Sequence, residues 1–163
     1  MVKQYVEWNE TIDQLARKYW PGALTMVLFV TPSVPPPTRG RNHERHSPTR
    51  PRVVSSAERG GNMNRLARGV IGQDGFVAFR VSEYPLAHDL SARLGRPIVS
   101  TSANMAGGPN PYALHEVIRA FEGRAVQPDI VIDAGTLPVR PPTTVVRVTG
   151  DHVEVFRQGE IVI

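Results

Sequence analysis

Apolar runs of strand length alternate with amphipathic stretches of helical length along this chain, and this alternation limits the fold more than any other feature. Such a pattern is typical of α/β folds, in which helices cover a sheet built from the apolar runs. The expected strands span residues 23–30, 76–81, 97–101 and 129–132. A hairpin of residues 144–149 and 153–156 around Gly150-Asp151 adds antiparallel pairing, so we expect a twisted mixed sheet with flanking helices.

Three helices are expected from their end signals and apolar faces. Asn9 is a good N-cap, and Pro21-Gly22 ends the helix that follows it. Pro85 opens a second helix, which Gly95 ends. Asn110 and Pro111 read as the N-cap and first position of a third. The apolar faces consist of Ile12, Leu15, Ala16 and Tyr19, then Leu86, Leu90 and Leu94, then Leu114, Val117, Ile118 and Phe121.

Residues 32–52 differ in composition from the rest of the chain. Six of these 21 residues are proline and five are arginine, and they show no apolar periodicity. Such a segment cannot bury enough surface to order itself, so we expect a flexible insertion over residues 31–75 of a single domain. It is either a solvated loop or a basic arm for RNA. Its two histidines, His43 and His46, do not form the H-E-x-x-H zinc motif, and we expect no metal site.

The charge distribution weakens a nucleic-acid interpretation of the whole domain. The pI is about 10, but residues 32–72 hold eight arginines against two glutamates, whereas the remainder has eleven bases and thirteen acids. The chain has no cysteine, which excludes disulfides and thiolate metal sites. No apolar run is long enough to cross a bilayer, and the first ten residues do not resemble a secretory signal. We expect a cytoplasmic protein with no membrane partner.

Two places depart from core-building rules in a way that suggests binding. Arg80 interrupts an apolar run, and its planar fork suits a carboxylate or a phosphate; alternatively it lies on the solvent face of a half-exposed strand. Ser100 and Ser102 follow an expected strand, where ligands of α/β sheets collect, and their hydroxyls suit an anion or a ribose. Turn chemistry explains the same serines equally well.

Two further places carry the same ambiguity. Residues 107–110 lead into a helix, whose N-terminus attracts negative charge, although Asn110 is also explained as a simple N-cap. Thr143 offers a hydroxyl at a strand entrance and Arg157 a cation after the hairpin; a proline-rich turn and an exposed terminal arginine are the alternatives. No nucleophile–base pair, paired carboxylates or metal cluster is present, so we expect a site that binds anions without a covalent nucleophile.

Five segments, taken in order, resemble the motifs of the YrdC-like family of threonylcarbamoyl-adenylate synthases. The family patterns are W-P-G-P-L-T, V-A-V-R-x-P, S-T-S-A-N-x-S-G-x-x-S-P, S-T-V-V-D and R-x-G-x-I. The corresponding segments are Trp20-Pro21-Gly22-Ala23-Leu24-Thr25, residues 76–81, residues 100–111, Thr143-Thr144-Val145-Val146 and residues 157–161. Each motif is weak alone, but the ordered set is specific and covers most of the chain outside the insertion.

The resemblance implies a YrdC-like α/β fold and a reaction that joins L-threonine, bicarbonate and ATP into threonylcarbamoyl-AMP and pyrophosphate. It implies that ATP is a substrate and carries Mg²⁺. It also implies that a downstream threonylcarbamoyl-transfer enzyme uses the product to modify tRNA. Transfer RNA or double-stranded RNA is a further partner to test. Carried over by position, the threonine-binding residues are Arg80, Ser100 and Thr143, and the ATP-binding residues are Phe76 through its backbone, Ser102, Asn110 and Arg157.

The sequence also departs from the family pattern. An upstream E-T-x-Y-G-L strand and a basic K-x-R motif have no counterpart, so we expect a domain that lacks the family's N-terminal portion. Val81-Ser82 follows Arg80 where the family has proline, and Ala106 and Asn110 replace serines. Two alternatives therefore stay open: a catalytically inactive RNA-binding module of the same fold, and a truncated fragment.

Overall fold

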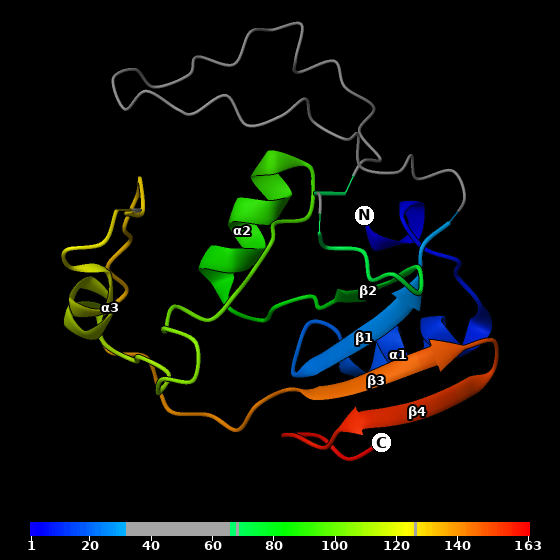
Figure 1. Cartoon of the computed structure of the whole chain (residues 1–163). Coiled ribbons are helices and arrows are strands. Elements are labelled where there is room, and N and C mark those ends of the chain that lie inside the picture. The colour runs from blue at the N-terminus through cyan, green and yellow to red at the C-terminus, as the bar shows by residue number, and fades with distance from the viewer. Residues whose placement is uncertain (32–65, 68, 126) are drawn as a thin grey trace, which may run out of the picture. The chain divides into compact units, whose positions relative to one another are not determined.

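The computed structural model describes residues 1–31, 66–67, 69–125 and 127–163 (Figure 1). The chain divides into two compact units. The first comprises Met1–Val99 together with Pro142–Ile163, and the second comprises Ser100–Pro141. The expected insertion over residues 31–75 lies mostly outside the described residues, although Leu66 and Val70 are described and pack against the core of the first unit.

A four-stranded mixed sheet forms the centre of the first unit, which confirms the expected fold class. Its strands are β1 (Leu24–Phe29), β2 (Phe76–Phe79), β3 (Thr144–Thr149) and β4 (His152–Arg157). They lie in the order β2-β1-β3-β4 (Figure 1). The central pair β1 and β3 is parallel, and both outer pairs are antiparallel. The predicted closing hairpin is β3–β4, and its turn contains Gly150 in the left-handed region that glycine favours.

The core lies between the sheet and α1 (Glu10–Tyr19), the helix expected after Asn9 (Figure 1). The Asn9 side chain accepts a hydrogen bond from the Ile12 amide at 2.9 Å, so it caps the helix as predicted. Residues of β1 and β3 alternate between buried and partly exposed, because only one face of the sheet meets α1. The buried residues are Tyr5, Val6, Ile12, Leu24, Met26, Leu28, Val77, Phe79, Val146 and Val148.

Asp13 ties the start of the chain to α1. Its carboxylate accepts hydrogen bonds from Lys3 Nζ at 2.7 Å and Trp8 Nε1 at 2.9 Å, and it pairs with Arg17 Nε at 2.6 Å. These donors favour the ionised form, and the hydrogen bond from Lys3 contributes most. They lower the pKa of Asp13 from 3.8 to about 2. The short 3-10 helix η1 (Val2–Gln4) is thereby held against the core.

The second and third expected helices also form, but the third begins later than predicted. Helix α2 (Pro85–Leu94) ends at Gly95, whose φ is 65°. Helix α3 (Leu114–Phe121) has Ala113 as its N-cap, so the assignment of Asn110 and Pro111 to the cap and first turn is wrong. The reason is Glu116, whose carboxylate accepts from the Tyr112 and Ala113 amides at 2.7 and 2.9 Å and so caps the helix further along the chain.

Two expected strands are absent from the described residues. Residues 97–101 and 129–132 are extended or irregular, and neither segment pairs with a described strand. Their apolar side chains are exposed, with Val99 at 68% and Ile130 at 80%. An apolar run becomes a strand only when a neighbour satisfies its backbone groups, and these two segments find none here. Within the described residues, no helix has the length and apolar character needed to cross a membrane.

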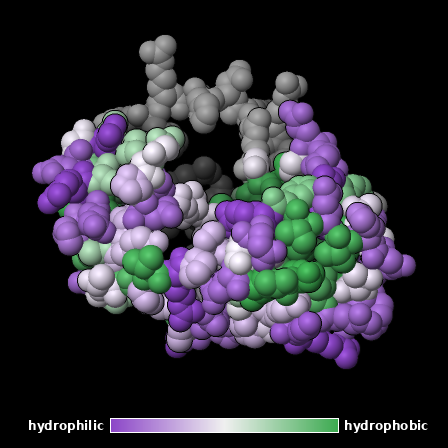
Figure 2. All heavy atoms as spheres, turned by 90° about the horizontal axis from the view of Figure 1, so that it is seen from below, coloured by the Kyte–Doolittle hydropathy of each residue, from purple (hydrophilic) through white to green (hydrophobic). Residues whose placement is uncertain are grey.

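The sheet face opposite α1 is not covered by any described element of the first unit. Figure 2 views the molecule from below, toward the edge of the sheet that β4 forms in Figure 1, and hydrophobic residues gather on part of this side. On β4 itself, Val155 and Phe156 point to opposite faces of the sheet and are 43% and 51% exposed, so this edge strand is exposed on both sides. The alternation of side chains along each strand places every second residue of β1, β2 and β3 on the face away from the core, where these residues are partly or fully exposed.

Candidate anion-binding site

A tight turn at the start of β1 holds Arg80 in place. Arg80 Nε donates a hydrogen bond to the Gly22 carbonyl at 2.9 Å, and the Gly22 amide donates to the Val81 carbonyl at the same distance. A Cβ at position 22 would lie 2.6 Å from the Tyr19 carbonyl oxygen, so only glycine fits this turn. Among the described residues, the two Nη groups of Arg80 make no hydrogen bond or ion pair. The guanidinium is thus anchored at one edge and open at the other.

Thr143 and Arg157 form a second cluster with Thr25. Arg157 donates through Nε and Nη2 to the Thr143 carbonyl at 3.1 and 2.9 Å, and Nη2 also reaches Thr143 Oγ1 at 3.1 Å. The Thr143 hydroxyl lies 3.0 Å from the Thr25 hydroxyl on β1. Arg157 therefore holds Thr143 in place, and the hydroxyls of Thr25 and Thr143 share one hydrogen bond.

The segment after β4 is fastened to the start of β3 through buried Thr144. The Thr144 hydroxyl donates to the Ile161 carbonyl at 2.5 Å and accepts from the Gly159 and Ile161 amides at 3.0 and 3.3 Å. A Cβ at Gly159 would lie 2.5 Å from the Thr143 carbonyl carbon and 2.6 Å from the Thr144 nitrogen. This close backbone approach explains the glycine and helps to hold neighbouring Arg157 beside Thr143.

Arg80 and the cluster of Thr25, Thr143 and Arg157 lie at the same end of the sheet and on its uncovered face. Leu24 pairs with Thr144 in the parallel ladder, and Met26 pairs with Phe79 in the antiparallel ladder. Because those partners point into the core, their chain neighbours Thr25, Thr143 and Arg80 point to the opposite face. The structure thus brings together three predicted residues, Arg80, Thr143 and Arg157. The sequence reasoning missed Thr25, although a hydroxyl inside an apolar strand was a usable signal.

Phe76 lies at the other end of β2, where it pairs with Phe29. Its ring contacts the Phe29 ring edge-on, with centroids 5.3 Å apart, and Arg147 stacks over it at 3.7 Å. Arg147 also pairs with Asp74 at 3.0 Å. The Phe76 side chain therefore has local partners and lies apart from the Arg80 cluster along the strand.

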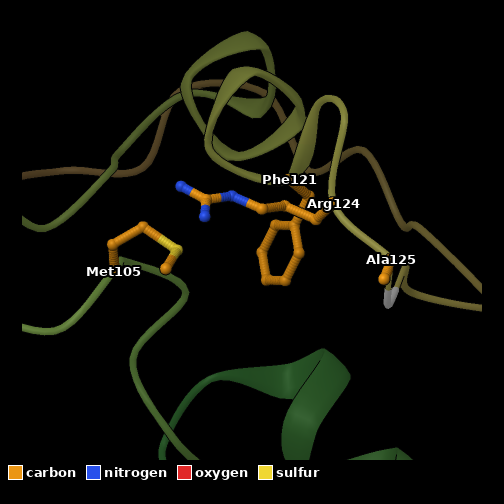
Figure 3. A pocket seen from close by; sticks show the side chains of 4 residues that line it. All are labelled: Met105, Phe121, Arg124 and Ala125. Carbon is orange, nitrogen blue, oxygen red and sulfur yellow. The ribbon is translucent and has the colours of Figure 1, made fainter.

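Ser100, Ser102 and Asn110 belong to the second unit, and all three are exposed there. The loop between them is held by Asn104, whose Nδ2 donates to the Gly108 carbonyl at 2.7 Å, while its buried Oδ1 has no partner in the described part of the chain. Beside this loop, a hollow of about 320 Å³ is lined by Met105, Phe121, Arg124 and Ala125 (Figure 3). The structure does not place these residues relative to the Arg80 cluster.

The basic arm expected from the sequence lies largely in residues 32–65 and 68, outside the described residues, and so do His43 and His46. The structure therefore describes neither the RNA-binding alternative nor the surroundings of the two histidines.

Comparison with known proteins finds clear relatives. The chain is 27% identical over 152 residues to a threonylcarbamoyl-AMP synthase of Bacillus subtilis, which covers 93% of this chain and 34% of that protein. It is 28% identical over 153 residues to one of Pyrococcus abyssi, with 94% and 35% covered. A shorter match to the protein of Pseudoalteromonas atlantica is 40% identical over 76 residues, or 47% of this chain and 38% of that protein. The chain thus spans little more than a third of the length of these relatives.

Solved structures of proteins from the same family also resemble this chain. The crystal structure of Pyrococcus abyssi Sua5 complexed with L-threonine superposes with a TM-score of 0.67 at 26% identity, covering 97% of this chain and 36% of that one. Escherichia coli YciO has a TM-score of 0.65 at 24% identity, with 97% and 60% covered, and supports the fold alone. The Sua5/YciO/YrdC family model, described as telomere recombination, matches residues 43–159. The chain therefore belongs to the Sua5/YciO/YrdC family.

Proposed function

We propose that this chain takes part in the synthesis of threonylcarbamoyl-AMP from L-threonine, bicarbonate and ATP, with pyrophosphate and water released. The observation that carries the proposal is the anchored guanidinium of Arg80, which lies at the same end of the sheet as the hydroxyls of Thr25 and Thr143. Relatives named threonylcarbamoyl-AMP synthase and a relative solved with L-threonine support it.

Arg80 is proposed to bind the carboxylate of L-threonine. Its Nε is used by Gly22, so its Nη groups are the donors left for a ligand in the described structure. Two parallel N–H donors match the two oxygens of a carboxylate. Thr143 lies nearby on the uncovered face and would contact the same substrate. Ser100 is proposed as a further threonine-binding residue from its place in the motif.

ATP is proposed to contact Ser102, Asn110 and Arg157, with its nucleotide beside the backbone of Phe76. Arg157 already spends Nε and Nη2 on Thr143, so its Nη1 is the group left for a phosphate. A carbamate formed from threonine and bicarbonate would attack the α-phosphorus, and pyrophosphate would leave. Positioning and charge neutralisation would supply the rate, without a covalent enzyme intermediate.

The remaining proposals concern context. Mg²⁺ would enter with the ATP phosphates as part of the substrate. Both units would belong to one YrdC-like domain, with residues 31–75 as an insertion. The product would pass to a threonylcarbamoyl-transfer enzyme acting on tRNA in the cytoplasm.

Pyrophosphate release by the purified chain tests this function. We expect release from ATP only when L-threonine and bicarbonate are both present, because each supplies atoms of the carbamate. Omitting either substrate is the matched control. A folded sample that releases no pyrophosphate above the omission controls would contradict the proposed activity.

A further inference from the structure

The Thr25 hydroxyl has a place in the site that the motif resemblance does not assign to it. We propose that Thr25 donates the hydrogen bond that completes carboxylate binding at Arg80, as the last member of a relay from Arg157 through Thr143. The inference rests on the amino-acid site of the proposed function and adds a specific donor to it.

Counting protons shows that the hydroxyl pair has one donor to spare. Each threonine hydroxyl has one proton and two lone pairs. Thr25 and Thr143 are 3.0 Å apart and share a single hydrogen bond, which uses one of their two protons. No other described residue accepts a hydrogen bond from either hydroxyl. The second proton is therefore available to a ligand with a free acceptor.

Arg157 sets the direction of the shared bond. Its Nη2 donates to Thr143 Oγ1 at 3.1 Å, which draws electron density from that oxygen. A hydroxyl polarised in this way is a better donor and a poorer acceptor for its neighbour. Thr143 then donates to Thr25, and the proton of Thr25 remains for the ligand. This order makes Thr25 the hydrogen-bond donor to the carboxylate, and it makes Thr143, which lines the same site, the residue that orients that donor.

The ligand favoured by this arrangement is a small carboxylate. Phe79 on β2 pairs with Met26 on β1. Because Arg80 follows Phe79 and Thr25 precedes Met26, Arg80 and Thr25 lie side by side on adjacent strands and on the same face. A carboxylate held by the Nη groups of Arg80 has lone pairs left on each oxygen, and a nearby hydroxyl donor satisfies one of them. A carboxamide offers one neutral oxygen, so a hydrogen bond from Thr25 to it lacks the charge assistance that a carboxylate provides and would contribute less.

Calorimetric titration of the full chain with L-threonine and with L-threoninamide tests the inference. Thr25→Val keeps the shape of the side chain and removes its hydroxyl, while Thr25→Ser keeps the hydroxyl. Thr149→Val is the matched control, because Thr149 is exposed on β3 beside the hairpin turn. We expect Thr25→Val to weaken L-threonine binding roughly tenfold and Thr25→Ser and Thr149→Val to bind like wild type. Binding of L-threoninamide should change little in Thr25→Val.

Each contrary outcome has a distinct meaning. Wild-type affinity for L-threonine in Thr25→Val would overturn the inference and leave the proposed function standing. Absence of L-threonine binding by the wild-type chain would overturn the amino-acid site itself. Pyrophosphate release that fails despite normal L-threonine binding would contradict the proposed reaction alone.

Discussion

Thr144→Val offers a sharp test of how the site is held together. Thr144 is fully buried, with 0% of its surface exposed, and valine has nearly the same shape. The substitution removes one donor and two acceptor interactions, which join Thr144 to Gly159 and Ile161. Because Arg157 directly precedes this segment, its hold on Thr143 should loosen as well.

The expected cost follows from these three hydrogen bonds. Each contributes about 0.5–1.5 kcal/mol net, and a partner left unsatisfied when buried costs about 1–3 kcal/mol. Burial of the extra methyl group returns about 0.8 kcal/mol. Since Gly159 and Ile161 are only partly buried and can regain water, we expect a net loss of about 2–3 kcal/mol in the free energy of unfolding.

Urea denaturation followed by tryptophan fluorescence measures this loss, because Trp8 and Trp20 both pack against the core of the first unit. With a slope of about 1–3 kcal/mol per molar urea, a loss of about 2–3 kcal/mol should lower the midpoint by about 0.7–3 M. Thr144→Ser should recover much of the loss, and Thr149→Val on the same strand should be nearly neutral. If Thr144→Val unfolds at the same urea concentration as Thr149→Val, the fastening role of Thr144 is refuted.

Two further predictions concern the turn before β1 and the start of α1. Gly22→Ala places a methyl group 2.6 Å from the Tyr19 carbonyl oxygen. We expect this substitution to lower the free energy of unfolding by about 1–3 kcal/mol and, by releasing Arg80, to weaken L-threonine binding. Wild-type values in both the urea denaturation and the L-threonine titration would contradict the role of the turn. Asp13 has its pKa lowered to about 2, so its stabilising effect should be complete above 3.8 and fade as the pH falls toward 2. The difference in urea midpoint between wild type and Asp13→Asn should follow that pH dependence, and a difference independent of pH would refute it.

The parts of the fold that the sequence predicted are those with local signals. Asn9 caps α1, Gly95 ends α2, and Gly150 marks the hairpin, because caps and turns depend on a few neighbouring residues. The strands expected at residues 97–101 and 129–132 were wrong, because a strand also needs a partner that an apolar run cannot reveal. The start of α3 was misplaced because Glu116 supplies the cap from inside the helix.

The site shows the same division. Arg80, Thr143 and Arg157 were predicted from motif order, and the sheet register brings them to one end of one face. The sequence could not show that Gly22 holds the guanidinium of Arg80 or that Thr25 contacts Thr143. The first contact joins residues 58 positions apart in the chain, and the second joins residues 118 positions apart. Long-range contacts of this kind depend on strand register, which the sequence constrains only through alternation.

Titration of L-threonine into wild type, Arg80→Lys and Arg80→Gln tests the central claim most directly, with Arg93→Gln on α2 as an exposed control. If Arg80 binds the carboxylate, Arg80→Gln should weaken binding about 10- to 150-fold, because a charge-assisted interaction is lost. Arg80→Lys should recover only part of it, since an ammonium lacks the fork. Wild-type affinity in a folded Arg80→Gln protein would contradict the claim that this arginine holds the amino acid.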